Sequence, residues 1–418
     1  MNFTLEELKS KGKLAKSAAR TLATTSPDIK KSVLLKIADA LIAKADYILT
    51  ENQKDLDLAK LNGMSDGLLD RLLLTPERIS AISEGVRQIA NLPDPIGEVI
   101  SNNVRPNGLS IDEVRVPLGV CGIIYEARPN VTADAAALCL KAGNACLLRS
   151  GKEAHKSSMA ITNVFKSVLR ENGLSQDAVA LVEDTSRESA LKLMRLNDYL
   201  DVIIPRGGKG LIKTVIENAT VPAIETGTGN CHIYVDSDFD AEMAKNIIIN
   251  AKTSRPSVCN AAEKLLIHKS VAEEFLPHIL SELTKKGVKI VGDNEVCQIF
   301  PDSVPATDED WETEYLDLKL GVKVVDSVCD AIAHINRYGS GHSEAIITNN
   351  PKNSEKFLKA VDAAAVYVNA STRFTDGFEF GFGAEIGIST QKLHARGPMG
   401  LKALTTSKYI IRGNGQIR

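Results

Sequence analysis

The sequence predicts an α/β protein built around mostly parallel sheets. From Val116 onward, short apolar runs alternate with segments at helical spacing; the run 120–125, for example, precedes an alanine-rich segment at 132–141. Adjacent parallel strands need a crossover connection, usually a helix, so this alternation favours right-handed β-α-β units. A chain of 418 residues is long enough for two or three domains with large buried cores.

The segment before this alternation predicts a layer of helices. From Thr4 to about Leu92, apolar residues recur at helical spacing among charged ones. Thr75-Pro76-Glu77 is typical of a helix start with proline at the first helical position. The proline-rich run 92–97 ends the layer.

A β-hairpin is expected next. The alternating segments 99–105 and 109–115 flank Pro106-Asn107-Gly108, and Asn-Gly between such segments is the strongest short-range hairpin signal. The sequence leaves two interpretations open, an interaction arm and a simple surface hairpin.

The α/β elements then follow in two sets. In the first set the expected strands are 120–125, 146–149, 179–182 and 202–204, and the expected helices are 132–141, 156–170, 186–194 and 210–218. In the second set the expected strands are 232–235 and 265–268, and the expected helices are 241–253 and 271–285. Open sheets of this kind commonly bind a nucleotide outside the carboxyl ends of their strands.

Composition argues against several classes of protein. The net charge is -3, aromatic residues make up 5%, and there is no basic tract, so no nucleic-acid partner is expected. No uncharged apolar stretch is long enough to span a bilayer, and the N-terminus lacks the features of a signal peptide, so we expect no membrane partner and a cytoplasmic location. The seven cysteines contain no Cys-x-x-Cys pair, so neither a disulfide framework nor a metal site is expected.

Two turns are candidates for binding a phosphate. The first turn contains Arg149, Gly151 and Lys152, and the second contains Gly207 and Gly208. Each turn follows an expected strand and precedes an expected helix. A glycine turn allows close backbone approach, and a helix N-terminus offers free N–H groups to an anion. The G-x-G-x-x-G fingerprint is missing, so ordinary strand-to-helix turns with exposed cations are the alternative.

Cys259 is the candidate nucleophile. It is flanked by Arg255 and small polar residues, with an acid, Glu225, upstream. The thiolate is the reactive form of cysteine, and nearby positive charge favours it. A covalent thioester would divide one difficult acyl transfer into two easier steps. The alternative is that Cys259 is a small buried hydrophobe, which is the commoner fate of a free cysteine.

The order of these features resembles the aldehyde dehydrogenase superfamily along nearly the whole chain. In that superfamily a Pro-x-Asn turn supplies an oxyanion-hole asparagine, matched by Asn130, and a Glu-x-Gly turn supplies a glutamate, matched by Glu225, 34 positions before Cys259. The superfamily's tryptophan before the asparagine is Pro129 here. Four longer runs are similar to the γ-glutamyl phosphate reductase family within it: 125–132 (YEARPNVT), 149–154 (RSGKEA), 229–236 (GNCHIYVD) and 394–401 (HARGPMGL).

This resemblance implies an oxidoreductase of proline biosynthesis. The implied reaction is the NADPH-dependent reduction of L-glutamyl 5-phosphate to L-glutamate 5-semialdehyde and phosphate, through a thioester on Cys259. The Cys259 backbone N–H and the Asn130 amide are the expected oxyanion donors, although Asn130 is also suited to capping the helix at Thr132. Glu225 matches the general base of hydrolytic relatives; we expect a lesser role, because water would hydrolyse the thioester.

The remaining site residues also follow from the resemblance. Glu314 aligns with the glutamate that holds the nicotinamide ribose, with a solvated acid as the alternative because the local motif is degraded. The substrate's phosphate and carboxylate need cations, and arginine suits bidentate anion recognition. Arg128 and Arg255, which flank Asn130 and Cys259 in sequence, are the first candidates for the phosphate. Arg373, His394 and Arg396 are candidates for the carboxylate and the phosphate. Each of them is alternatively a structural ion-pair partner, and His232 is expected to be a packed histidine.

The resemblance also implies a domain plan. The fold is expected to be aldehyde dehydrogenase-like, with a Rossmann-type NADP-binding domain (1–98 and 115–225), an α/β catalytic domain (226–400) and a small β oligomerisation arm (99–114 and 401–418). A homo-oligomer and a separate, transiently bound glutamate kinase are the expected partners. Alternatives are an aldehyde dehydrogenase that oxidises a small aldehyde to its acid, a non-catalytic scaffold and a metal-dependent hydrolase.

Overall fold

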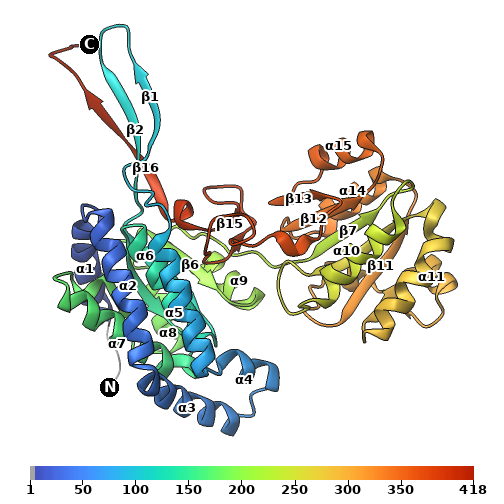
Figure 1. The fold of residues 1–418 in the computed structure, drawn as a ribbon, viewed down its shortest axis with the longest axis horizontal. Coiled ribbons are helices and arrows are strands. Elements are labelled where there is room, and N and C mark those ends of the chain that lie inside the picture. The colour runs from blue at the N-terminus through green and yellow to red at the C-terminus, as the bar shows by residue number, and fades with distance from the viewer. Residues whose placement is uncertain (1–4) are drawn as a thin grey trace. The chain divides into compact units, whose positions relative to one another are not determined.

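A computed structural model describes residues 5–418 (Figure 1). Residues 1–4 lie outside the described residues. The expected helical layer, which starts at Thr4, and the N-terminal segment in which no signal peptide is expected both begin there. The chain forms two compact units. The first runs to Thr226 and also includes Gly381–Gly387 and Met399–Arg418; the second contains Gly227–Phe380 and Ile388–Pro398.

The expected helical layer is present in the first unit. Its helices are α1 (Leu5–Leu22), α2 (Pro27–Ala43), α3 (Ala45–Leu61), α4 (Asp66–Leu72) and α5 (Pro76–Asn91). The helix start at Pro76 is confirmed, and the Thr75 side chain accepts a hydrogen bond from the Arg78 N–H, which is an N-cap. Helices α2 and α5 pack against each other and against the helices of the adjoining sheet.

A four-stranded parallel sheet forms the centre of the first unit. Its elements are β3 (Val120–Tyr125), α6 (Pro129–Lys141), β4 (Ala145–Arg149), η1 (Lys152–Ala154), α7 (His155–Glu171), η2 (Gln176–Ala178), β5 (Val179–Leu181), α8 (Arg187–Leu193), β6 (Val202–Arg206) and α9 (Lys209–Asn218). The strand order is β5-β4-β3-β6, so the direction of winding reverses between β3 and β6. Ligands of open α/β sheets bind at such a switch point.

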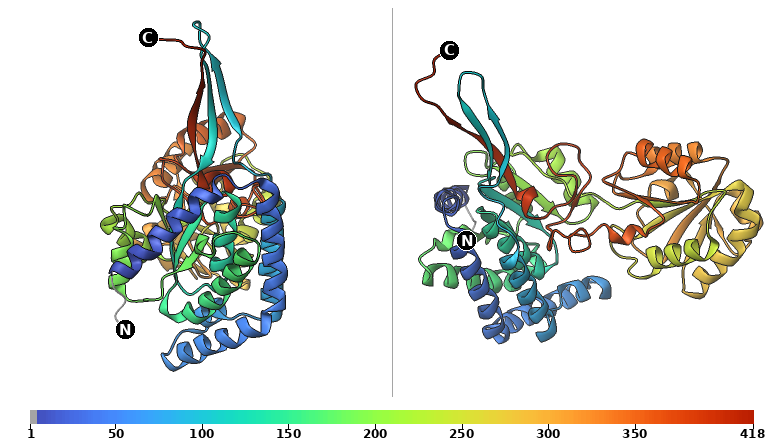
Figure 2. Two further views of the ribbon diagram at one scale, coloured as in Figure 1. Left: turned by 90° about the vertical axis from the view of Figure 1, so that its left-hand side faces the viewer. Right: turned by 45° about the horizontal axis from the view of Figure 1, so that its top comes forward.

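The expected hairpin is also present. Strands β1 (Val99–Val104) and β2 (Ser110–Pro117) pair antiparallel, and β16 (Thr405–Arg412) adds a third strand on the other side of β2. This three-stranded ribbon extends away from the helices of its own unit (Figure 2). Tyr409 and Ile411 of β16 are exposed, as are Val99 and Val104 of β1.

The second unit contains a seven-stranded parallel sheet. Its elements are β7 (Cys231–Val235), α10 (Ala241–Thr253), β8 (Ala262–His268), α11 (Lys269–Lys285), β9 (Lys289–Gly292), α12 (Asn294–Ile299), β10 (Val304–Pro305), α13 (Asp308–Glu312), β11 (Lys319–Val325), α14 (Val328–Tyr338), β12 (Ser343–Ile347), α15 (Pro351–Ala360), β13 (Ala365–Val368) and η3 (Thr372–Phe374). The strand order is β10-β9-β11-β8-β7-β12-β13, with every pair parallel.

Side chains of this sheet alternate between two buried layers. Along β7, Ile233 and Val235 pack in one cluster with α10 and α11, whereas Tyr234 packs in the other with α14 and Phe357 of α15. Figure 1 shows these helix pairs on opposite faces of the sheet. Successive side chains of a strand point to opposite faces, so a strand buried on both faces contributes alternate residues to the two layers. A shift by one residue would exchange the two sets, and the packing therefore specifies the register of the sheet.

A short antiparallel pair and a final 3-10 turn complete the fold. Strand β14 (Ile388–Ser389) pairs with β15 (Gly397–Pro398) in the second unit. The turn η4 (Leu401–Leu404) precedes β16 in the first unit. Within residues 5–418, no helix is both long enough and apolar enough to cross a membrane.

Candidate active site

Cys259 lies in the loop between α10 and β8, at the amino end of β8. Its side chain is half-buried, whereas Cys121, Cys139, Cys146 and Cys231 are fully buried. The alternative of a buried filler residue therefore fits those four cysteines and not Cys259. The loop of Cys259 lies at the amino edge of the second sheet, opposite to the edge at which open sheets usually bind nucleotides.

Gly229 approaches the backbone of Cys259 very closely. A Cβ built at Gly229 would lie 1.6 Å from the Cys259 carbonyl oxygen, so only glycine fits there. The same carbonyl oxygen accepts a hydrogen bond from the Cys231 thiol at 3.1 Å. The two segments come from neighbouring parallel strands, since Gly229 precedes β7 and Cys259 precedes β8. The loop 254–261, which carries the candidate nucleophile Cys259, is thus held through its own backbone.

Glu314 lies beside this contact. Its Oε1 accepts a hydrogen bond from the Gly229 N–H at 2.6 Å, so Glu314 is not a solvated acid. The residues after it are held by the buried Glu263 carboxylate, which accepts from the N–H groups of Tyr315 at 3.1 Å and Leu316 at 3.2 Å. Leu316 has a φ of 54°, a conformation that non-glycine residues rarely adopt and that the Glu263 contact supports.

Burial raises the pKa of Glu263 to about 7, although the positive charge of Lys252 opposes this shift. The Lys252 Nζ lies 3.4 Å from a Glu263 oxygen, and both side chains are fully buried. A buried carboxylate without such a partner would be strongly destabilised. This ion pair therefore supports the loop that carries Glu314.

Arg373 of η3 is hydrogen-bonded to the loop that carries Cys259. Its Nε donates to the Ser254 hydroxyl at 3.1 Å. The Asn260 amide donates to the Thr375 carbonyl at 2.9 Å, and the Thr372 hydroxyl donates to the Asn260 carbonyl at 2.7 Å. Burial, and secondly the neighbouring Arg255 charge, lower the pKa of Arg373, while the Cys259 thiolate acts in the opposite direction. Arg255 and Cys259 therefore both lie within electrostatic range of Arg373.

Two further predicted cations lie on the loop between β14 and β15. Arg396 forms an ion pair with Asp362 at 2.8 Å, and Lys392 shares the same carboxyl group at 2.5 Å. Arg396 is thus a structural ion-pair partner, which is the alternative to a role in substrate binding. His394 is exposed and has a φ of 64°.

Asn130 lies in the first turn of α6. The alternative role of Asn130 as the cap of this helix is not found, because the helix begins at Pro129 and the N-cap residue is Arg128, whose side chain makes no capping bond. Instead, the Asn130 amide donates to Asp134, one turn later, at 3.2 Å. An ionised carboxylate only accepts hydrogen bonds, so it directs the amide NH2 group towards itself. Burial raises the pKa of Asp134 to about 6, against the effect of the Asn130 hydrogen bond.

The first phosphate turn follows β4. The Arg149 guanidinium donates to the carbonyl oxygens of Thr185 at 2.6 Å and Ser186 at 2.9 Å, so it already binds the adjacent loop. Burial lowers the pKa of Arg149. Gly151 is buried and Lys152 is exposed at the start of η1, with no ion pair of Lys152 within residues 5–418. Lys152 is thus the available cation of this turn.

The second turn lies at the switch point after β6. A Cβ at Gly207 would lie 2.7 Å from the carboxyl group of Glu126, which follows β3. The Gly208 N–H donates to a Glu126 carboxylate oxygen at 2.9 Å. The N-terminus of α9 is therefore capped by an acid of the chain itself. A glycine cradle exists here, but an anion would have to displace or share the Glu126 contact.

Glu225 is half-buried at the end of the main segment of the first unit. The next residue, Thr226, donates from its hydroxyl to the Pro205 carbonyl at 2.8 Å, which fixes the turn beside β6. In the second unit, Gly227 lies against Thr390, whose Cγ2 would be 2.2 Å from a Cβ at 227. The Glu-x-Gly turn thus has a constrained backbone on both sides.

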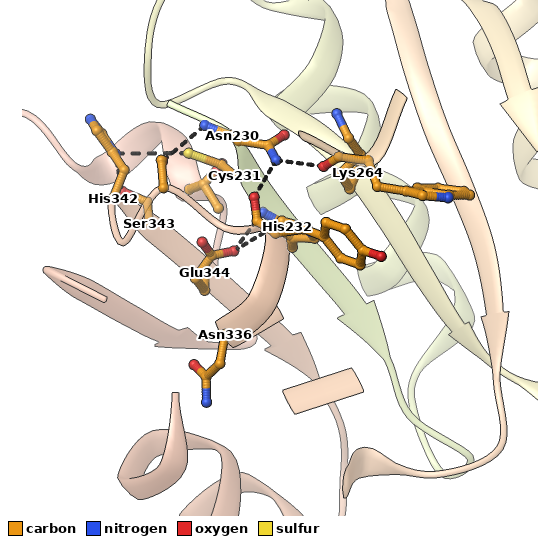
Figure 3. A network of polar contacts seen from close by, with 12 residues as sticks. Asn230, Cys231, His232, Lys264, Asn336, His342, Ser343 and Glu344 are labelled. Carbon is orange, nitrogen blue, oxygen red and sulfur yellow. Dashed lines mark hydrogen bonds and ion pairs between the residues drawn. The ribbon is translucent and has the colours of Figure 1, made fainter. Parts of the chain in front are cut away.

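A buried polar network lies around the start of β7, with Asn230, His232 and Glu344 among its members (Figure 3). His232 is completely buried, as expected, and its Nδ1 lies 3.0 Å from Glu344 Oε2. Burial lowers the pKa of His232 to about 3 and raises that of Glu344, so the pair is held uncharged. Both amide hydrogens of Asn230 are used, by the carbonyl oxygens of Trp311 and Tyr338, each at 2.8 Å.

Sequence reasoning did not assign roles to Gly229, Glu263, Glu126 or Asp134. Only the Asn130–Asp134 pair had a local signal, since amide and carboxylate side chains four positions apart on a helix are neighbours. The other contacts join segments distant in sequence, so their geometry becomes visible only in the folded chain. Among residues 5–418, no cluster of histidine, cysteine and acidic side chains is suited to hold a metal ion.

Comparison with known proteins agrees with this architecture. Residues 2–298 match the aldehyde dehydrogenase family. The chain is 61% identical to the γ-glutamyl phosphate reductase of Clostridium botulinum (strain Alaska E43 / Type E3), covering 99% of this chain and 100% of that protein. It is 62% identical to the enzyme of the same name from Clostridium perfringens (strain 13 / Type A), covering 99% of each chain.

A solved structure is also similar. The crystal structure of γ-glutamyl phosphate reductase from Thermotoga maritima superposes with a TM-score of 0.97 at 50% identity, covering 99% of this chain and all of the other. The chain therefore belongs to the aldehyde dehydrogenase family and, within it, to the γ-glutamyl phosphate reductases.

Proposed function

We propose that this chain reduces L-glutamyl 5-phosphate to L-glutamate 5-semialdehyde, with release of inorganic phosphate, as the second step of proline biosynthesis from glutamate. Identity of about 60% along the whole chain to proteins named for this reaction supports the proposal. The observation that carries it in the structure is the half-buried Cys259 thiol, with Arg255 and Arg373 beside it.

Cys259 is the proposed nucleophile. Its Sγ bonds to the γ-carbonyl carbon of the substrate, the bond from that carbon to the phosphate oxygen breaks, and phosphate leaves with a proton from solvent. The thioester then accepts a hydride at its carbon. When the tetrahedral species collapses, the carbon–sulfur bond breaks, the aldehyde leaves and the electron pair returns to Cys259 as thiolate. Each turnover restores the starting thiolate.

Negative charge develops on the substrate's carbonyl oxygen in both additions. The Cys259 N–H and the Asn130 amide are the proposed donors to it. Because Asp134 uses one hydrogen of the Asn130 amide, the second hydrogen has a fixed direction. Orientation of this kind lowers the reorganisation needed at the moment of reaction.

NADPH is the proposed cofactor and supplies the hydride, that is, two electrons, when bound. The family uses nicotinamide cofactors, and the first sheet has the strand order and the glycine turns suited to a dinucleotide. Gly151 and Lys152 are the proposed contacts for the adenosine-side phosphate, with Arg149 as support for the turn. Gly207, Gly208 and Glu314 are the other proposed cofactor contacts.

Arg255 and Arg373 are the proposed ligands of the departing phosphate, because both lie at the Cys259 loop. Arg128 is a further proposed ligand of the phosphate, because it precedes Asn130 in sequence. His394 and Arg396 are proposed for the substrate carboxylate, and Arg396 contributes less because Asp362 already binds it. We propose that Glu225 tunes the site rather than activating water, since hydrolysis of the thioester would waste the substrate.

The proposed division of labour follows the two units. The first is assigned to NADP and the second to catalysis, and the ribbon of β1, β2 and β16 to oligomerisation through its exposed apolar side chains. Light scattering of a Tyr409→Lys variant, compared with the wild type, tests the ribbon. A separate glutamate kinase is the proposed source of the acyl phosphate, and the free thiols suit a reducing cytoplasm.

The decisive experiment follows NADPH oxidation while a glutamate kinase generates glutamyl phosphate in the cuvette. Cys259→Ala should reduce turnover to background, with an unchanged thermal unfolding midpoint; retained turnover would refute the nucleophile. The competing function, oxidation of a small aldehyde to its acid, is separated in the reverse direction. Oxidation of the semialdehyde that depends on added phosphate supports the reductase, whereas acid release without phosphate supports the alternative.

A further inference from the structure

The second unit has a pocket whose lining includes none of the predicted site residues. It has a volume of about 340 Å³ and lies between α13, β11 and α14. Trp311, Lys323, His334, Arg337 and Tyr338 line it, with Asp308 as its one acidic lining residue. This volume is near the lower end of ligand pockets, which are ~300–1,000 Å³, so a ligand of about one ring fits it.

The pocket has an excess of positive charge. Within residues 5–418, Arg337 makes no ion pair, and its guanidinium lies 4.8 Å from the centre of the Tyr338 ring. The nearest acid to Lys323 is Asp293, at 3.9 Å. The carboxylate of Asp293 already accepts hydrogen bonds from the N–H groups of Val296 and Val324. The lining thus holds two cations and one acid, with Lys323 partly balanced by Asp293 and Arg337 without an ion pair among the described residues.

The pocket is lined by aromatic rings, and one imidazole nitrogen there has no hydrogen-bond partner among the described residues. The ring of His334 lies 5.5 Å from Trp311 and 4.7 Å from Tyr338, measured between ring centres. His334 is 8% exposed, and its Nε2 has no hydrogen-bond partner within the described residues. A buried polar atom without a partner is costly, which is a reason to expect a ligand group near it.

From these contacts we propose that the pocket is a second ligand site, for a small carboxylate on a flat ring. Arg337 and Lys323 bind the carboxylate, because a guanidinium matches its two oxygens. The ring of the ligand packs against Trp311 and Tyr338. A neutral molecule of the same shape lacks the charge that the two cations need, so the site discriminates against it.

The pocket is connected to the nucleophile loop by Asn230. Its amide group donates to the carbonyl oxygens of Trp311 and Tyr338, which both line the pocket. The preceding residue is Gly229, which contacts Cys259 and Glu314. A ligand that moves either aromatic residue therefore acts on the segment that holds the nucleophile.

Trp311 makes the proposal directly testable, because it is the single tryptophan of the chain. The fluorescence of the full-length protein is followed during titration with sodium benzoate, with sodium chloride to match ionic strength and benzamide as the uncharged analogue. We expect a saturable change with benzoate alone. Arg337→Ala and Lys323→Ala should each weaken binding about tenfold, as for loss of a charged hydrogen bond.

Lys352→Ala is the matched control, since it removes an exposed lysine of α15 that is not among the lining residues of the pocket. It should leave the benzoate affinity unchanged. Thermal unfolding confirms that each variant is folded, and calorimetric titration gives the affinity independently of fluorescence. No saturable benzoate signal, an equal response to benzamide, or an unchanged affinity in Arg337→Ala would each overturn the proposal.

Discussion

Gly229 and Cys259 are in contact through their backbones, so closely that a Cβ at position 229 would lie 1.6 Å from the Cys259 carbonyl oxygen. The Gly229 N–H at the same time donates to Glu314. One residue without a side chain thus links the loop of the proposed nucleophile to the loop proposed to hold the cofactor ribose. The position of the thiol depends on this contact.

Gly229→Ala should therefore displace the Cys259 loop. We expect kcat to fall by at least about 100-fold, because misplacement of a reacting group by about 1 Å costs that much. Steady-state NADPH oxidation measures the effect, and circular dichroism checks the fold. Gly67→Ala, in α4, is the control: a Cβ there meets nothing within 4 Å, so activity should stay at the wild-type level. Normal turnover in Gly229→Ala would show that the loop position tolerates the change.

Asp134 is expected to act through Asn130. Loss of the oxyanion donor in Asn130→Ala should lower kcat about 100- to 1,000-fold. Asp134→Ala should cost only about five- to tenfold, the value of one hydrogen bond that positions the amide. In the double variant, Asp134→Ala should add nothing once Asn130 is gone. Additive effects in this cycle would mean that Asp134 acts independently of the amide.

The same pair predicts a pH dependence. Burial raises the pKa of Asp134 to about 6, so the carboxylate that accepts from Asn130 is present above about pH 6 and is lost below it. The wild-type kcat should decrease as the pH falls through about 6, whereas Asp134→Asn should lack this decrease. An identical acid limb in both proteins would assign the decrease to another group.

Arg373 is expected to contribute to substrate binding. Arg373→Ala should raise KM for the acyl phosphate about 10- to 100-fold, the range for a charged hydrogen bond, with a smaller change in kcat. Arg373→Lys should recover part of the loss, because it keeps the charge but not the planar fork. Lys359→Ala removes an exposed lysine of α15 and should leave KM unchanged. A kcat loss with normal KM would place Arg373 outside the ground-state binding site.

Much of the fold was predictable from local patterns. The strand 120–125 and the helix 241–253 have the expected bounds, because apolar runs and helical spacing are properties of adjacent residues. The helix α6 begins three residues earlier than expected, since Pro129 takes the first helical position, which a proline favours. The third strand of the ribbon pairs residues almost 300 positions apart, as in the Tyr409–Glu113 pair, and no local pattern encodes that pairing.

The site was predictable only in part. The family motifs indicated Cys259, Asn130 and Glu314, but the contacts that hold them required the folded chain. Glu263 follows Cys259 by a few residues, yet it supports the loop at Tyr315. In the sequence Glu263 looks like an ordinary strand residue. Its supporting role becomes visible only in the folded chain, where it is buried beside Lys252.

His334 should make stability dependent on pH. Burial, followed by the charges of its neighbours, lowers its pKa from the usual 6.5 to about 3. Between these values the unfolded chain binds a proton that the native protein does not, so stability is fully present above about pH 6.5 and is lost as the pH falls. At about pH 5 this one residue should cost about 2 kcal/mol relative to pH 7.5.

Urea unfolding followed through Trp311 measures this effect, because Trp311 lies in the second unit beside His334. The free energy of unfolding of the wild type should decrease between pH 7.5 and 5 by about 2 kcal/mol more than that of His334→Gln, which cannot titrate. His278→Gln, at an exposed position of α11, should retain the full wild-type decrease. The opposing contribution of Glu344, whose pKa burial raises, is common to all three proteins and cancels in the comparison. Equal decreases in the wild type and His334→Gln would mean that His334 is already protonated in the native state at pH 5.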